Sequence, residues 1–194
     1  MKLCGLTGGV GMGKSTAASF FLQHGARVID TDALARELVQ PGQPALDEIR
    51  EAFGETVFAA DGSLRRDKLA EIAFSSTTAR HQLEAILHPR IRGAWLSQVE
   101  KWKHDNGSLV IVVIPLLFET AAETHFEKII CVACTSASQR NRLSERGWSD
   151  TQISQRIAAQ MPVEQKIARS HHVVWTEGML AAHELQVARV FDRL

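Results

Sequence analysis

Short apolar runs alternate along the chain with longer segments of helical periodicity. Such an alternation is typical of a parallel sheet whose strands are connected by crossover helices. The run Leu109–Ile114 contains no alternating polar residue, as expected for a strand covered on both faces, so we predict a central position for it. The predicted strands are Lys2–Thr7, Arg27–Asp30, Leu109–Ile114, Lys128–Cys134 and His172–Trp175.

A helical insertion separates the second and third predicted strands. Residues 33–108 contain several helical patterns and no convincing strand. The end of this stretch predicts two helices, 77–87 and 89–103, because Pro89 disfavours helical conformation at His88. A connection of about 75 residues far exceeds the dozen or so that one crossover needs. We therefore predict an inserted helical subdomain.

A second helical segment, residues 136–170, has a break at Gly147 and a predicted N-cap at Ser149-Asp150. We expect an α/β fold of three layers with a five-stranded parallel sheet and two helical insertions. The expected divisions of this single domain, about 2–194, are a first core segment (1–32), the helical subdomain (33–108), a second core segment (109–135), the helical segment 136–170, and a final segment (171–194) with a strand and a C-terminal helix.

Composition and charge narrow the class of protein. Of 194 residues, 45% are hydrophobic and 23% are charged, which excludes an intrinsically disordered chain. The 22 basic residues balance 22 acidic residues, so no overall basic field favours nucleic acid or anionic membranes. The longest apolar run, 109–117, is much shorter than the roughly 20 residues of a membrane span. With no signal-peptide pattern at the start, we expect a cytoplasmic protein.

The three cysteines do not indicate a disulfide framework. Cys131 and Cys134 form a C-x-x-C pattern, but they lie on a predicted strand, where residues three apart point to opposite faces. We expect them to be plain buried thiols rather than metal ligands or a disulfide.

The candidate chemistry begins directly after the first strand, where Gly8–Ser15 matches G-x-x-x-x-G-K-[ST]. In such a phosphate loop, glycines allow backbone N–H groups to turn toward an anion. We expect Lys14 to bind the β- and γ-phosphates and the Ser15 hydroxyl to bind Mg²⁺. The following helix, predicted from Lys14 to His24 and ended by Gly25, directs its positive dipole end at the phosphates. These features predict a nucleoside triphosphate site.

A phosphate loop alone serves kinases, GTPase switches and mechanical ATPases. The sequence contains no Asn-Lys-x-Asp motif for guanine recognition, and the short chain leaves little room for further machinery. These features favour a small-molecule kinase, whose acceptor would bind over the carboxyl ends of the strands. The two helical insertions would then hold the acceptor and form a lid that excludes water.

Two acidic residues follow the second predicted strand. Asp30 and Asp32 are alternate residues of an expected extended segment, so both carboxylates could point into one cleft. One could accept the proton of the acceptor hydroxyl, and the other could hold Mg²⁺ through water. The alternative is that Asp32 caps a helix beginning at Ala33. The residues alone favour neither reading.

Basic residues concentrate in the second insertion. Arg140, Arg142 and Arg146 share one predicted helix, and Arg156 lies on the next. Arg142 and Arg146 are i,i+4 neighbours, and a bound polyphosphate would offset their repulsion. The alternative is a solvated helix face that Glu145 partly neutralises.

Further segments accompany the phosphate loop: Val28–Arg36, His88–Ile91, Pro115–Glu119, Gln139 with Arg142 and Arg146, and Arg156–Gln160. Together with Gly5–Thr16 they resemble the dephospho-coenzyme A kinase family, whose members catalyse the last step of coenzyme A synthesis. The resemblance extends over nearly the whole chain. The Asp-x-Asp, His-Pro and Pro-Leu-Leu-x-Glu segments are specific to this family rather than to phosphate-loop proteins in general.

The resemblance implies a phosphate-loop NTPase fold and transfer of the ATP γ-phosphoryl group to the ribose 3′-hydroxyl of dephospho-coenzyme A. It implies Asp32 as the general base and Arg142 as a lid residue that reaches the phosphates; Lys14 completes the expected catalytic set. Mg²⁺ would be bound by Ser15 directly and by Asp30 through water. The residues expected to bind ATP are Gly9, Val10, Gly11, Met12, Gly13, Lys14, Ser15, Thr16, Arg142, Arg146 and Thr176. Those expected to bind the acceptor are Thr7, Asp32, Arg36, His88, Pro89, Leu116 and Glu119.

Two departures from the family pattern concern the nucleotide site. The family usually has Ala-Asp before its last core strand and Asn-x-Gly after it, whereas this chain has Ser170-His171 and Thr176-Glu177-Gly178. The second segment lies where adenine is expected. Alternatives are another small-molecule or nucleoside monophosphate kinase, and an ATP-binding regulator without catalysis. We expect no nucleic-acid or membrane partner and a monomer or small homo-oligomer.

Overall fold

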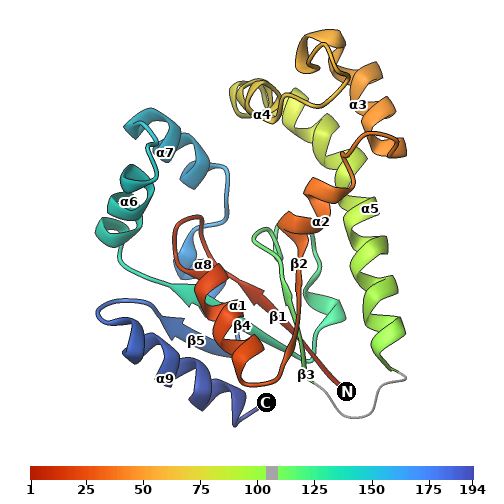
Figure 1. Cartoon of the computed structure of the whole chain (residues 1–194). Coiled ribbons are helices and arrows are strands. Elements are labelled where there is room, and N and C mark those ends of the chain that lie inside the picture. Colours follow the sequence, from red (N-terminus) through yellow and green to blue (C-terminus); the bar gives the residue numbers. More distant parts are fainter. Residues whose placement is uncertain (104–108) are drawn as a thin grey trace. The chain divides into compact units, whose positions relative to one another are not determined.

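The computed structural model describes residues 1–103 and 109–194. These residues contain a five-stranded parallel sheet in the order β2-β3-β1-β4-β5 with helices on both faces, which confirms the predicted α/β fold (Figure 1). All five predicted strands are present, and two end one residue earlier than predicted. β3 is interior, but β1 holds the central position expected for β3. The strands are β1 (Lys2–Thr7), β2 (Arg27–Asp30), β3 (Leu109–Val113), β4 (Lys128–Ala133) and β5 (His172–Trp175).

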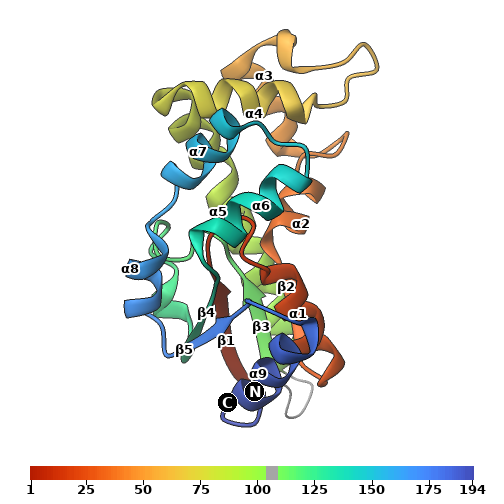
Figure 2. The same cartoon turned by 90° about the vertical axis from the view of Figure 1, so that its left-hand side faces the viewer.

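Different elements cover the two faces of the sheet (Figures 1 and 2). On one face, α1 (Lys14–Gln23) and α9 (Leu180–Phe191) pack side by side over a buried apolar core. On the other, α8 (Val163–Ala168) packs on β4, and the Leu117 side chain approaches Gly5 so closely that a Cβ atom there would lie 2.5 Å away. The parallel register brings the carboxyl ends of the strands to one edge, where their loops gather.

The described residues form two compact units. One comprises Met1–Asp30 and Trp102–Leu194 and contains the sheet, and the other comprises Thr31–Lys101. The second unit is helical and has its own apolar core, in which Leu46 and Ile49 are buried. Its helices are α2 (Thr31–Glu37), α3 (Pro44–Phe53), a 3-10 turn (Glu55–Val57), α4 (Arg66–Ser75) and most of α5 (Thr77–Lys103). The end of the predicted insertion, residues 104–108, lies outside the described residues.

The helix α5 corrects the prediction of two helices separated at His88-Pro89. It runs without interruption over Thr77–Lys103 with the proline inside. A proline within a helix removes one backbone hydrogen bond and clashes with the preceding turn, at a cost of about 3 kcal/mol. Apolar packing on both sides of Pro89 offsets this cost, because Leu83 packs on the core of the helical unit and Trp95 is buried.

The end of β2 also differs from the prediction. The strand ends at Asp30, and α2 begins at Thr31 with Asp32 in its first turn. Asp30 and Asp32 are therefore not alternate residues of one extended segment, and Asp32 is not the cap of a helix beginning at Ala33. Both expectations were wrong because β2 passes into α2 without an extended residue between them.

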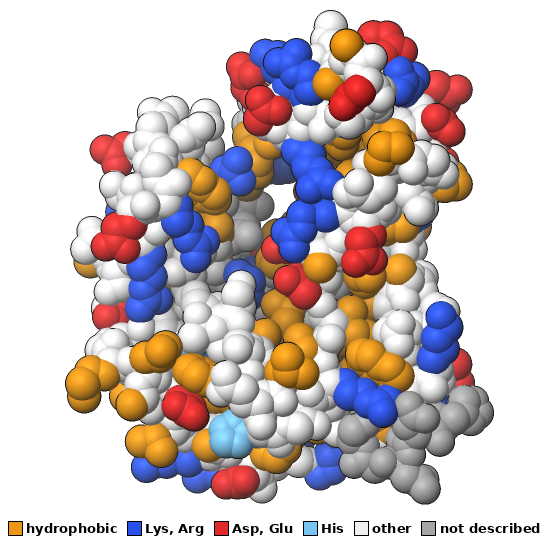
Figure 3. All heavy atoms as spheres, in the orientation of Figure 1, with side chains coloured by type: hydrophobic (Ala, Val, Ile, Leu, Met, Phe, Trp, Pro, Cys, Tyr) orange, Lys and Arg blue, Asp and Glu red, His pale blue; other side chains and the backbone are white. Residues whose placement is uncertain are grey.

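The segment 136–170, which we call the lid segment, contains α6 (Ser136–Glu145), α7 (Asp150–Ala158) and α8. The predicted N-cap of α7 is confirmed as a capping box. Ser149 Oγ accepts a hydrogen bond from the Gln152 N–H at 3.3 Å, and Gln152 Oε1 accepts one from the Ser149 N–H at 3.0 Å. Basic side chains gather over α6 and α7 (Figure 3).

The cysteines Cys4, Cys131 and Cys134 are free and buried, as expected. Burial raises the pKa of Cys4 and of Cys131 to about 11, so these thiols stay protonated at neutral pH. None of the helices in residues 1–103 and 109–194 has the length and apolarity needed to cross a bilayer.

Candidate functional site

The phosphate loop follows β1 directly and leads into α1. Gly8 lies against β4, where a Cβ atom would stand 2.1 Å from the Val132 carbonyl oxygen, so a larger residue would displace the strand. Gly13 precedes α1 with a φ of 93°, a left-handed conformation that glycine adopts without steric cost. Because Gly13 has no side chain to cap the helix, the first N–H groups of α1 can bind an anion, and the helix dipole favours negative charge there.

Lys14 and Ser15 are the first two residues of α1. The Lys14 ammonium group donates hydrogen bonds to the carbonyl oxygens of Gly8 and Gly9, both at 2.9 Å. Its positive charge therefore lies over the glycine-rich part of the loop. Ser15 is exposed and carries its hydroxyl in the first turn of the helix.

Two glutamine side chains of the lid segment hold the loop at Val10. Gln139 Nε2, on α6, donates to the Val10 carbonyl oxygen at 2.8 Å. Gln160 follows α7, and its Oε1 accepts a hydrogen bond from the Val10 N–H, also at 2.8 Å. The lid segment thus contacts both backbone polar groups of one loop residue and fixes the orientation of its peptide units.

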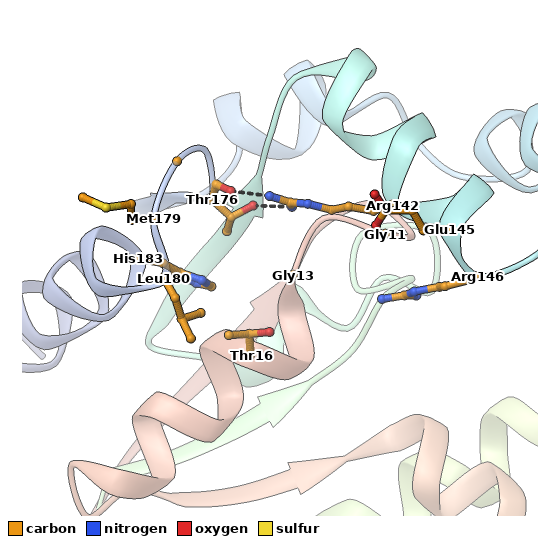
Figure 4. A pocket seen from close by; sticks show the side chains of 11 residues that line it. Gly11, Gly13, Thr16, Arg142, Glu145, Arg146, Thr176, Met179, Leu180 and His183 are labelled. Carbon is orange, nitrogen blue, oxygen red and sulfur yellow. Dashed lines mark hydrogen bonds between the residues drawn. The ribbon is translucent and has the colours of Figure 1, made fainter.

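Thr176, directly after β5, links the loop to α6 (Figure 4). Its Oγ1 donates a hydrogen bond to the Met12 carbonyl oxygen at 3.0 Å and accepts one from Arg142 Nη1 at 2.8 Å. Arg142 Nη2 also donates to the Thr176 carbonyl oxygen. Met12 participates through its backbone, with its N–H donating to the Gly9 carbonyl oxygen at 3.3 Å and its side chain buried. The Arg142 guanidinium is therefore held beside the loop.

Glu177 fixes the turn after β5 to the start of α6. Its carboxylate accepts hydrogen bonds from the Thr135 N–H at 2.7 Å and from Ser138 Oγ at 2.8 Å. These bonds, above all the one from the Thr135 N–H, lower the pKa of Glu177, so it is ionised at neutral pH. A negative charge is favourable at the start of a helix.

A cavity of about 380 Å³ adjoins the phosphate loop within the sheet-containing unit (Figure 4). Its volume is in the range of small-molecule sites. The loop forms one side of its wall, and the turn after β5 and the start of α9 form another. Its wall includes Gly11, Gly13 and Thr16 from the loop side, Arg142 from α6, Arg146 directly after α6, and Thr176.

The structure brings two of the four arginines of the lid segment to this cavity. Arg142 and Arg146 line it. Arg140 instead approaches a serine hydroxyl of α7 at 3.4 Å, and the Arg156 guanidinium stacks 4.1 Å from the ring centroid of Trp148. The basic helix face is therefore divided between the cavity and the packing of the lid segment itself.

A buried lysine supports the loop after β3. Lys166, on α8, is fully buried, and its Nζ lies 2.8 Å from Glu119 Oε1 and donates to the Pro115 carbonyl oxygen at 2.6 Å. The same carbonyl oxygen accepts a hydrogen bond from Thr7 Oγ1, at the end of β1, at 3.3 Å. Leu116 is half-buried in this loop. The Glu119 side chain is 21% exposed, so the pair is not isolated from solvent.

Residues 160 and 161 of the lid segment connect this loop with the phosphate loop. Gln160 binds Val10, and the N–H of the next residue, Met161, donates to Glu119 Oε1 at 2.8 Å. A displacement of these two residues therefore acts on both loops at once.

Four of the predicted acceptor-binding residues belong to the helical unit. Asp32 and Arg36 are exposed on α2, and His88 and Pro89 lie on α5. His88 is half-buried, and its burial lowers the pKa of the imidazole, so this histidine is neutral at neutral pH. Asp30 belongs to the sheet-containing unit, at the carboxyl end of β2. The assembly of these residues with the phosphate loop into one site stays a prediction.

Comparison with known proteins decides the family. A family model described as dephospho-CoA kinase matches residues 2–182. This chain belongs to the dephospho-CoA kinase family. The dephospho-CoA kinase of Acinetobacter baylyi is 45% identical over 93% of this chain and 91% of its own length. That of Bdellovibrio bacteriovorus is 40% identical over 90% of this chain and 87% of its own length.

Two solved structures have a fold similar to that of this chain. The crystal structure of TT1252 from Thermus thermophilus has a TM-score of 0.83 at 32% identity and covers 100% of this chain and 97% of that one. The dephospho-CoA kinase from Campylobacter jejuni has a TM-score of 0.72 at 24% identity, with coverage of 100% and 97%. The second likeness supports the fold.

The two departures from the usual dephospho-CoA kinase pattern have local explanations. His171 stands where the family usually has Asp, and its Nδ1 accepts a hydrogen bond from the Ile129 N–H at 3.1 Å, as a carboxylate oxygen could. Thr176 stands where Asn is usual, and its hydroxyl both donates and accepts, as an amide side chain can.

The residues around the site that were not predicted include His183 and Lys166. His183 lies on the buried stripe of α9 with Val187 and Val190, so a histidine at an apolar position of a helix was the available signal. Lys166 gave no signal, because a lysine in a polar stretch normally indicates an exposed side chain. Its burial depends on the distant residue Glu119.

Proposed function

We propose that this protein transfers the γ-phosphoryl group of ATP to the ribose 3′-hydroxyl of dephospho-CoA, giving CoA and ADP. The observation that carries the proposal is a phosphate loop opening α1 in a chain of the dephospho-CoA kinase family. The reaction forms a bond between the 3′-oxygen and the γ-phosphorus and breaks the bond to the β,γ-bridging oxygen. The hydroxyl proton passes to a base.

The phosphate loop is proposed to bind the triphosphate and to stabilise the charge of the transition state. The first N–H groups of α1 would donate hydrogen bonds to phosphate oxygens. The Lys14 ammonium would leave the Gly8 and Gly9 carbonyl oxygens and bind the β- and γ-phosphates instead. Arg142 and Arg146 would approach from the lid segment. Because phosphoryl transfer requires little covalent participation of the protein, such positioned donors supply most of the rate enhancement.

Mg²⁺ is proposed as the companion of ATP. The donor set suits this ion, because Ser15 offers a hydroxyl, Asp30 offers a carboxylate, and Mg²⁺ prefers oxygen ligands and retains several waters. Ser15 would bind the ion directly and Asp30 through water. When bound, the ion neutralises charge on the β- and γ-phosphate oxygens.

Asp32 is the proposed general base, and it would accept the 3′-hydroxyl proton as the oxygen attacks. Asp32→Asn keeps the shape of the side chain and removes its basicity, so kcat should fall by about 10²–10⁴-fold while the Kd of ATP stays unchanged. Steady-state kinetics and calorimetry separate the two effects. A variant with near-normal kcat would show that Asp32 is not the general base.

The proposed acceptor contacts are Thr7, Asp32, Arg36, His88, Pro89, Leu116 and Glu119.

The direct test of the function is ADP release with Mg·ATP in the presence and absence of dephospho-CoA, together with a panel of nucleoside monophosphates and sugar alcohols. We expect release that depends on dephospho-CoA and on Mg²⁺. Preference for another acceptor would identify a different small-molecule kinase. ATP binding without turnover on any acceptor would identify a non-catalytic nucleotide-binding protein.

A further inference from the structure

One polar atom in the wall of the cavity is buried without a hydrogen-bond partner. His183 lines the cavity and is only 5% exposed. Within the residues that the structure describes, its Nε2 is buried and makes no hydrogen bond. Such a buried atom loses its hydration without replacement, which is unfavourable. A ligand that supplied the missing partner would remove this cost.

Packing fixes the orientation of this imidazole. Its ring meets the buried ring of Phe20, on α1, edge to face, with centroids 5.3 Å apart and planes at 90°. Figure 4 shows the imidazole projecting from α9 toward the side of the cavity that the phosphate loop forms. The unpartnered nitrogen therefore has a defined position before a ligand binds, which reduces the entropic cost of a hydrogen bond to it.

The imidazole presents a neutral group to the cavity. Burial, and to a lesser extent the charge of Arg142, lower the pKa of His183, so the ring is neutral at neutral pH. A neutral imidazole has one donor and one acceptor nitrogen, which matches the polar edge of a neutral heterocycle. Phosphate, in contrast, would be matched by Lys14, by the start of α1, and by Arg142 and Arg146.

The position of the cavity decides which portion of a nucleotide reaches His183. A triphosphate on the phosphate loop would lie at Gly11 and Gly13, and the cavity continues from there past Thr16 to the start of α9. The remainder of the nucleotide must therefore extend toward Thr176 and His183. We infer that Nε2 of His183 forms a hydrogen bond with a polar edge of the purine base and that this contact determines base preference. The inference rests on one part of the proposed function, namely that the protein binds ATP. It does not depend on the acceptor.

Calorimetric titration of variants tests this inference. His183→Leu places an apolar side chain against Phe20 and removes the proposed hydrogen bond, so the Kd of ATP should rise about tenfold, which corresponds to about 1.4 kcal/mol. The Kd of ribose 5-triphosphate, which has the sugar and phosphates without a base, should stay unchanged. His183→Gln places an amide nitrogen close to the position of Nε2 and should restore most of the ATP affinity. Glu184→Ala, at an exposed neighbour on α9, is the matched control and should bind both ligands normally.

The unmodified protein offers a second measurement that does not depend on the folding of a variant. With ¹⁵N-labelled histidine, saturation with ATP should shift the Nε2 resonance of His183, whereas ribose 5-triphosphate should shift it much less. The signal is assigned by its absence from His183→Gln. Equal shifts with the two ligands, or no shift with ATP, would contradict the contact with the base.

The outcomes separate this inference from the proposed function. Unchanged ATP affinity in His183→Leu, or an equal loss for ATP and ribose 5-triphosphate, would overturn the role of His183 and leave the kinase proposal intact. Absence of ATP binding by the unmodified protein would overturn both. A third outcome is that no acceptor is phosphorylated while His183→Leu loses affinity for ATP but not for ribose 5-triphosphate. This outcome would overturn the kinase proposal and support the contact of His183 with the base.

Discussion

The phosphate loop and the adjoining wall of the cavity belong to one unit, yet they rely on different groups of the chain. In the loop, Gly8 fits because it has no Cβ, and Val10 is held through its N–H and carbonyl groups. In the cavity wall the polar groups belong to side chains: the Thr176 hydroxyl, the Arg142 guanidinium and the His183 imidazole.

This difference implies that the two regions tolerate substitution to different degrees. Backbone recognition requires glycine at the points of close approach, so the residue pattern of the loop is narrowly constrained. Side-chain recognition accepts any residue with the right donors and acceptors, such as the Thr176 hydroxyl, which both donates and accepts. Variants in the two regions should therefore differ in how strongly they change kcat, KM and stability.

The largest effect should come from Lys14, whose ammonium group is the one side-chain charge that the loop itself carries. Lys14→Ala removes this charge and leaves the loop backbone in place. We expect kcat to fall by about 10²-fold or more with little change in melting temperature, since one positioned donor contributes this much to a transition state. Kinetics and thermal melts measure the two quantities. A near-normal kcat would show that the loop acts through its backbone alone.

Arg142 should have the next largest effect, because it both contacts Thr176 and lines the cavity. We expect Arg142→Ala to lower kcat by about 10²-fold. Arg140→Ala is the matched control on the same helix, since Arg140 is exposed and lies 3.4 Å from a serine hydroxyl. Equal losses in the two variants would indicate a general effect of basic charge on α6 rather than a specific contact.

Thr176 should show an intermediate effect on binding and stability. Thr176→Val keeps the shape and removes the hydroxyl, leaving the buried Met12 carbonyl oxygen and Arg142 each short of one partner. We expect a loss of about 1–3 kcal/mol in the free energy of unfolding and a severalfold rise in the KM of ATP. Chemical denaturation and kinetics measure these changes.

Thr176→Ser keeps the hydroxyl and is the control for this substitution. It should lie close to the unmodified protein in both measurements. If Thr176→Val and Thr176→Ser behaved alike, the hydroxyl of Thr176 would have no role in binding or stability. The presence of threonine in place of the usual asparagine would then need another explanation.

The smallest effect should come from the side chain of Val10, because both hydrogen bonds from the lid segment to this residue involve its backbone groups. Val10→Ala should change kcat/KM by less than about twofold, as expected for a substitution that leaves every hydrogen bond in place. A loss comparable to that of Arg142→Ala would contradict the distinction between backbone and side-chain recognition.

The strands and the phosphate loop could be predicted because their signals are local. The apolar run of β3 and the pattern Gly8–Ser15 each specify their structure within a few residues. The same holds for the cap at Ser149, whose partner Gln152 lies three residues away. The family resemblance supplied the function and the residue roles that spacing alone left open.

Features that depend on competition between local and distant forces were predicted wrongly or missed. At Pro89 the local preference for a helix break was outweighed by packing along α5. At Asp32 the sequence did not reveal that the helix begins at Thr31, two residues before the expected first residue Ala33. The burial of Lys166 depends on Glu119, 47 residues earlier, which no local pattern encodes.

The measurement that tests the central claim most directly is the structure of the reaction product. Dephospho-CoA is incubated with Mg·ATP and the protein, and the product is analysed by mass spectrometry and ³¹P NMR. We predict one added phosphoryl group, present as a monoester on the ribose 3′-oxygen, with one ADP formed for each product molecule. Unmodified dephospho-CoA, or a phosphoryl group on another oxygen, would contradict the account.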